Sequence, residues 1–130
     1  MAGGAGPIAA GNSRAVSFAK DAYDLQAPVI VAASTLAEVL PGGGRDSDVH
    51  RVLRRIDVSP IDKTKARAAG ELLGRLGLSG HENALDALVA VVALAQPRPV
   101  VLLTSHTDDM TRLTHEAGRP ARERIAVVRI

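Results

Sequence analysis

The feature that most constrains this fold is an apolar segment that contains a single acid. From Ala84 to Ala95 the chain runs A-L-D-A-L-V-A-V-V-A-L-A, and Asp86 is its only polar residue. A helix that is apolar on all sides is typical of a protein core. A buried carboxylate is costly unless it is paired, hydrogen-bonded or bound to a metal ion. The segment therefore predicts an almost wholly buried helix in which Asp86 has a partner.

A second group of acids follows an apolar strand. Residues 100–103, V-V-L-L, predict a buried strand that ends at Thr104, and the chain continues as T-S-H-T-D-D to Asp109. Polar groups at the carboxyl end of a parallel strand lie where α/β sheets place their binding sites. Asp86 and the acids after this strand are therefore expected to approach one another.

The rest of the chain alternates strands with helices. This alternation predicts an α/β domain with a mostly parallel sheet and helices on both faces, a three-layer α/β/α arrangement. The two most apolar strands, 29–32 and 100–104, are expected to be adjacent or near its centre. A single domain is expected over residues 1–130, with the Gly- and Ala-rich residues 1–12 as a loop or weak first strand. The predicted strands are 28–33, 56–61, 100–104 and 125–130, and the predicted helices are 13–25, 35–40, 46–55, 62–76, 82–95 and 107–117.

Composition excludes several classes of function. The chain has no cysteine, which excludes disulfides and thiolate metal sites. Phe18 and Tyr23 are its only aromatic residues among Phe, Tyr and Trp, so stacking of bases on aromatic rings cannot be a main binding mode. No apolar run approaches the roughly 18 residues of a membrane span. No secretory signal is evident, so a cytoplasmic location is the default expectation. The net charge of +2 permits an anionic partner without requiring one.

Two pairs of residues have both a structural and a functional interpretation. Glu82 and Asp86 are four residues apart and share one helix face near the helix start, where the helix dipole favours acids. The helix dipole alone is enough to explain Glu82, but it explains Asp86 less well, because Asp86 lies in apolar sequence. Thr35 and Glu38 fit a capping box, in which the acid closes the first helical turn. Glu38 also follows the carboxyl end of strand 28–33, which favours a place in the same site.

The segment after strand 100–104 has the same two interpretations. Thr107 is expected to cap the next helix, which places Asp108 and Asp109 in its first turn, where the helix dipole alone would favour them. A zinc site is not expected, because no H-E-x-x-H spacing is present. Three further polar residues could contribute to a site: Thr104, Ser105 and His106. His106 could be a metal ligand or a phosphate contact, or merely a surface histidine.

Carboxylates that meet at the ends of different strands, without cysteine or a histidine cluster, favour Mg²⁺ or Mn²⁺ over zinc. One or two such ions lower the pKa of a bound water and hold a phosphodiester for in-line attack. The pattern therefore points to phosphoryl chemistry on nucleic acid.

Three segments together resemble the PIN-domain proteins, and most closely the ribonuclease toxins of the VapBC type. They are L-A-E-V at 36–39, E-N-A-L-D-A-L-V-A at 82–90 and V-V-L-L-T-S-H-T-D-D-M at 100–110, and the resemblance extends from about residue 14 to the C-terminus. It implies a parallel sheet between helices and Mg²⁺- or Mn²⁺-dependent cleavage of RNA. The second family acid falls on Glu38, the third on Asp86 and the last acidic segment on 105–109. VapBC-type toxins pair with a small antitoxin and often form homodimers, so both partners are expected here, with an apolar patch near helices 35–40 and 49–53.

The chain departs from the family pattern at two acids. The family often has D-A-G-P where this chain has G-A-G-P, so Gly4 stands in place of an aspartate, and the usual T-S-D has become T-S-H with His106. Fewer hard oxygen ligands should bind the metal weakly, so RNA cleavage is expected to be slow or absent. The alternatives are a catalytically silent PIN-like domain that binds RNA or a protein, and a small α/β domain whose acids only cap helices.

Overall fold

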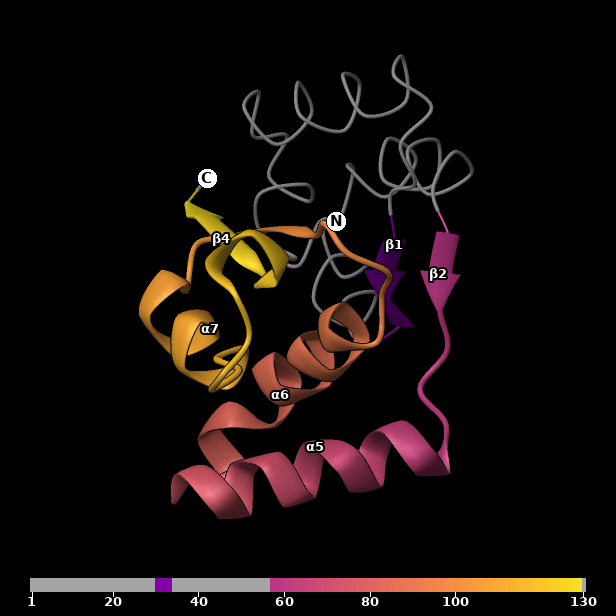
Figure 1. Ribbon diagram of the computed structural model, residues 1–130. Coiled ribbons are helices and arrows are strands. Elements are labelled where there is room, and N and C mark those ends of the chain that lie inside the picture. The colour runs from indigo at the N-terminus through magenta and orange to yellow at the C-terminus, as the bar shows by residue number, and fades with distance from the viewer. Residues whose placement is uncertain (1–29, 34–56, 130) are drawn as a thin grey trace.

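The structure, a computed structural model, describes residues 30–33 and 57–129 (Figure 1). The predicted features at 1–12, 13–25, 35–40 and 46–55 lie outside these residues, and so do Gly4, Glu38 and the apolar patch expected near 35–40 and 49–53. The described elements are strands β1 (Ile30–Ala32), β2 (Asp57–Ser59), β3 (Val101–Thr104) and β4 (Ala126–Arg129), helices α5 (Lys63–Leu76), α6 (Gly80–Leu94) and α7 (Thr107–Leu113), and the short 3₁₀ helix η2 (Ala121–Glu123).

The four strands form two parallel pairs. β1 pairs with β2, and β3 pairs with β4 in a register that runs from Val101 opposite Ala126 to Thr104 opposite Arg129. The parallel pairing, together with α5 and α6 between β2 and β3 and with α7 between β3 and β4, is compatible with the predicted α/β class. β1 and β3, expected adjacent or near the centre of one sheet, belong to different pairs within the described ranges. Each is hydrogen-bonded instead to the next described strand along the chain.

Helix α6 is the centre of the described core. Its buried face packs against α5, α7 and β1 (Figure 1). The expectation that residues 84–95 are almost wholly buried is wrong for the first turns, because Leu85 is 44% exposed. The polar opening of the helix, with His81 and Glu82, lies in solvent, and the buried face begins only at Ala87. Among the helices of the described ranges, including this apolar one, none has the length and apolarity to cross a membrane.

Helix α5 has the boundaries that its sequence predicts. The Asp62 carboxylate accepts a hydrogen bond of 2.8 Å from the backbone N–H of Lys65, which satisfies one of the free donors of the first turn. Gly77 ends the helix with a φ of 65°, a left-handed conformation that glycine adopts without a steric penalty. The buried residues Ala69, Leu72 and Leu73 form the apolar face of this helix.

Helix α7 is shorter than predicted and begins differently. It ends at Leu113, not near residue 117, and the Thr114 hydroxyl donates a hydrogen bond of 2.7 Å to the Met110 carbonyl at that point. His106 occupies the N-cap position expected for Thr107, yet its side chain makes no capping hydrogen bond. The reason is that the imidazole faces α6 instead, and this contact is the starting point of the site.

Candidate functional site

Asp86 and His106 are brought together from two separate elements. The imidazole Nδ1 of His106 lies 3.2 and 3.3 Å from the two carboxylate oxygens of Asp86. Asp86 comes from the second turn of α6, and His106 comes from the segment that follows β3. The Asp86 side chain is 20% exposed and the His106 side chain 58% exposed. The acid of the apolar helix therefore has a partner, which is an imidazole at the rim of the core.

The backbone after β3 is held in a tight turn. Thr104 is almost fully buried, and its hydroxyl accepts a hydrogen bond of 2.9 Å from the backbone N–H of His106. A threonine hydroxyl that accepts from the residue two positions later makes a turn without help from a backbone carbonyl. This turn places His106 beside α6 and leaves Ser105 exposed.

Arg129, at the end of β4, contacts the same turn from its other side. Its Nη1 donates to the Ser105 carbonyl at 3.2 Å, and its Nη2 donates to the Thr107 hydroxyl at 2.5 Å. The parallel register places Arg129 opposite Thr104, so both strands end at one edge. Sequence reasoning missed this residue. The available signal was a single charge near the end of an otherwise apolar strand, I-A-V-V-R-I.

The remaining predicted acids among the described residues lie in the first turns of α6 and α7. Asp108 is exposed and Asp109 half-buried in the first turn of α7, and Glu82 is exposed one turn before Asp86 on α6. Across residues 30–33 and 57–129, no three histidine, aspartate or glutamate side chains gather closely enough to hold a metal ion. These residues alone therefore do not supply a complete ligand set. Because Glu38 lies outside them, the predicted combination of Glu38, Asp86 and Asp109 stays a prediction.

The Asp86–His106 pair has a defined chemical capacity. A neutral imidazole with its proton on Nδ1 donates to the carboxylate and presents Nε2 as a hydrogen-bond acceptor; a protonated imidazole presents Nε2–H as a donor. A carboxylate that orients a histidine in this way is a common arrangement for proton transfer and for contact with anionic ligands. The edge therefore combines an oriented imidazole with hydroxyl, carboxylate and guanidinium groups.

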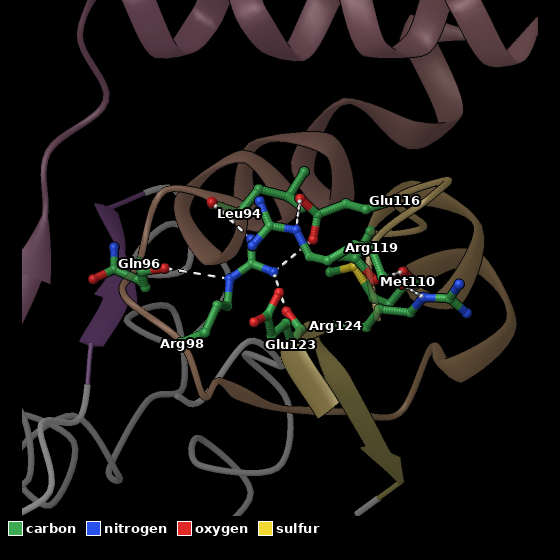
Figure 2. A network of polar contacts seen from close by, with 9 residues as sticks. Leu94, Gln96, Arg98, Met110, Glu116, Arg119, Glu123 and Arg124 are labelled. Atoms are coloured by element: carbon green, nitrogen blue, oxygen red, sulfur yellow. Dashed lines mark hydrogen bonds and ion pairs between the residues drawn. The ribbon is translucent and has the colours of Figure 1, made fainter. Parts of the chain in front are cut away.

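A second polar cluster surrounds Arg98 before β3 (Figure 2). The Arg98 side chain is 12% exposed and makes an ion pair with Glu116. It also donates to the Glu123 carbonyl at 2.8 Å and to the Leu94 carbonyl at 3.0 Å. One guanidinium thus joins the end of α6, the turn before β3 and the connection from α7 to β4. Because its donors are used by backbone carbonyls and one acid, this cluster, defined here as the Arg98 clamp, has a structural role.

The clamp predicts an acid-sensitive contribution to stability. The hydrogen bond from Arg98 holds the pKa of Glu116 below its usual range, against a smaller opposing effect of burial and with help from the charges of Arg98 and Arg119. A carboxyl group whose pKa is lower in the folded than in the unfolded protein stabilises the fold at pH values above its pKa in the unfolded protein. This stabilisation is lost as the pH falls through the pKa of the group in the folded protein. Urea unfolding from about pH 6 to about pH 3 should therefore show a smaller loss of stability for Glu116→Gln than for the wild type. Equal pH dependence in both proteins would contradict this assignment.

No family model, curated protein or solved structure matches this chain.

Proposed function

We propose that this chain is a PIN-like, Mg²⁺- or Mn²⁺-dependent endoribonuclease with a weakened metal site, and that it is the toxin of a toxin–antitoxin pair or a degenerate relative of one. RNA is the proposed substrate. A small antitoxin protein and a second copy of the chain are the proposed protein partners.

One observation carries this proposal. The carboxylate of Asp86 on a core helix faces the polar segment 104–109 at the carboxyl end of a parallel strand, and His106 contacts it directly. This is the edge at which α/β proteins bind ligands. Two sequence segments that carry the resemblance, 82–90 and 100–110, therefore meet in space.

The residues have separate proposed roles. Asp86, Glu38 and Asp109, with Asp108 in support, would hold the ion, and a bound Mg²⁺ or Mn²⁺ would supply an activated water and offset the charge of the phosphodiester. His106 stands where an acid is expected, and it pairs with Asp86 instead of adding a negative oxygen. A neutral imidazole is a poor ligand for Mg²⁺ and a better one for Mn²⁺. With histidine in place of an acid at position 106, we expect slow RNA cleavage that is faster in Mn²⁺ than in Mg²⁺.

A catalytically silent RNA-binding domain is the second candidate. The observation that favours it is the engagement of both Asp86 oxygens by His106 Nδ1, at 3.2 and 3.3 Å. An ion must compete with the imidazole for the same carboxylate. If that competition is lost, the edge retains contacts for RNA without the means to cleave it.

The deciding experiment compares the wild type with Asp86→Asn. We expect slow cleavage of single-stranded and hairpin RNA in Mn²⁺, which EDTA abolishes, and a loss of at least about tenfold in Asp86→Asn. Calorimetry should show a parallel loss of Mn²⁺ affinity, because the amide removes a charged oxygen ligand.

Asp57→Asn is the matched control, since Asp57 is an exposed aspartate at the start of β2. It should leave both cleavage and metal affinity unchanged. Cleavage that persists in EDTA or in Asp86→Asn would overturn the metal-dependent proposal. RNA binding with no cleavage in either metal would support the silent candidate.

A further inference from the structure

We propose that Arg129 and His106 together bind one phosphate of the RNA backbone at the carboxyl edge of β3 and β4. This inference rests on the proposed function, because it names the substrate contact of the same site. The juxtaposition behind it is a guanidinium that is hydrogen-bonded on both sides of His106, to Ser105 and to Thr107.

Arg129 is fixed in place without losing its charge. Its two contacts are to neutral acceptors, a carbonyl and a hydroxyl, and no carboxylate within residues 30–33 and 57–129 lies at ion-pair distance. Arg98, by contrast, is paired with Glu116, and Arg67 with Glu71. A guanidinium has five N–H donors, so three remain after the two bonds that Arg129 makes within the described residues. Arg129 is exposed in the described part of the chain, so these donors can reach an anion.

The imidazole of His106, the residue between these two contacts in the sequence, is also oriented. Nδ1 of His106 faces Asp86, and within residues 30–33 and 57–129 no hydrogen bond engages Nε2, which can therefore meet a ligand. The hydrogen bonds that Thr104 and Arg129 make to the turn fix the backbone of His106. A planar guanidinium matches two phosphate oxygens at once, and a pre-ordered one loses little side-chain entropy when it binds them.

Charge and composition both favour an RNA phosphate as the ligand. Asp86, Asp108 and Asp109 place negative charge along this edge, so an anionic substrate needs a fixed cation there, which Arg129 supplies. With Phe18 and Tyr23 as its only Phe, Tyr or Trp residues, the chain cannot depend on base stacking. RNA binding must then come largely from phosphate contacts, which are strongly salt-dependent.

The test is the salt dependence of RNA affinity. Fluorescence anisotropy would measure binding of a short labelled single-stranded RNA in Mg²⁺ over a series of NaCl concentrations, with intact RNA verified on gels. We expect Arg129→Gln to weaken binding about tenfold. The slope of log affinity against log salt should decrease in magnitude by about 0.7, the value for one lost phosphate contact on a single strand. Arg129→Lys should restore most of the slope because it keeps the charge.

Two controls separate a phosphate contact from a structural role. Arg67→Gln removes an exposed arginine of α5 that is paired with Glu71, so it should change neither affinity nor slope. If Arg129 only holds the turn, Arg129→Gln would weaken binding with an unchanged slope, and this result overturns the inference. Thermal unfolding verifies that each variant is folded. If Arg129→Gln does not fold, Arg129→Ala takes its place, and an unchanged RNA affinity and salt slope in that folded variant overturns the inference.

A second probe, inorganic polyphosphate, separates this inference from the proposed function. RNA binding that does not depend on Arg129 overturns the inference and leaves the proposed function standing. Polyphosphate binding that depends on Arg129, with no RNA binding, supports the phosphate site and overturns RNA as its ligand. Binding of neither probe by the wild type overturns both.

Discussion

Replacing Arg98 with methionine should lower the free energy of unfolding by about 3 kcal/mol. Methionine retains most of the apolar length of the side chain but removes the guanidinium. Glu116 then loses its short ion pair, and the carbonyls of Leu94 and Glu123 lose a charged donor. Urea denaturation followed by circular dichroism at neutral pH would measure the change.

Arg67→Met is the matched control for this substitution. The Arg67–Glu71 pair is 77% and 61% exposed on α5, and such surface pairs contribute less than about 1 kcal/mol. If the two variants lose the same stability, the Arg98 clamp is no more than a surface contact and its proposed structural role is wrong.

Leu102→Ala should be similarly damaging, with a loss of about 3 kcal/mol. Leu102 has no exposed surface, and its strand β3 lies within the core that α6 and α7 share. Truncation removes apolar contacts and leaves a cavity that neighbouring side chains fill only partly. The same urea titration measures this loss.

Val101→Ala provides the comparison within one strand. Val101 precedes Leu102 in β3, points to the opposite face and is 42% exposed, so its truncation should cost about 1 kcal/mol or less. Equal losses at both positions would show that strand propensity, and not burial, determines the effect.

Elements with local signals were predictable from the sequence. The ends of α5 follow from Asp62 and Gly77, which act on the turn next to them, and the strand at 100–104 follows from its continuous apolar run. The early end of α7 was not predictable in this way. Glu116, which continues the helical pattern, is held by Arg98 from a position eighteen residues earlier, and no local signal indicates that contact.

In the candidate site, too, some features were predictable from the sequence and others were not. The approach of Asp86 to the segment after β3 follows from topology. In α/β folds, polar groups that must reach solvent or a ligand gather at the carboxyl ends of the parallel strands. The choice of His106 as its partner, and the arrival of Arg129, depend on strand register and on the turn at Thr104. These are long-range features that a single sequence does not specify. Asp108 and Asp109 both lie in the first turn of α7, where the helix dipole favours acids.

The Arg98 clamp and the polar turn lie at opposite ends of the β3–β4 pair. The clamp joins the segments that enter the two strands, whereas the turn at 104–107 and Arg129 lie where the strands end. Changes to residues where the strands end can therefore alter the binding of a ligand, while the Arg98 clamp keeps the two strands aligned where they begin. A substitution at position 106 should therefore leave the start of both strands, and with it the folded domain, intact.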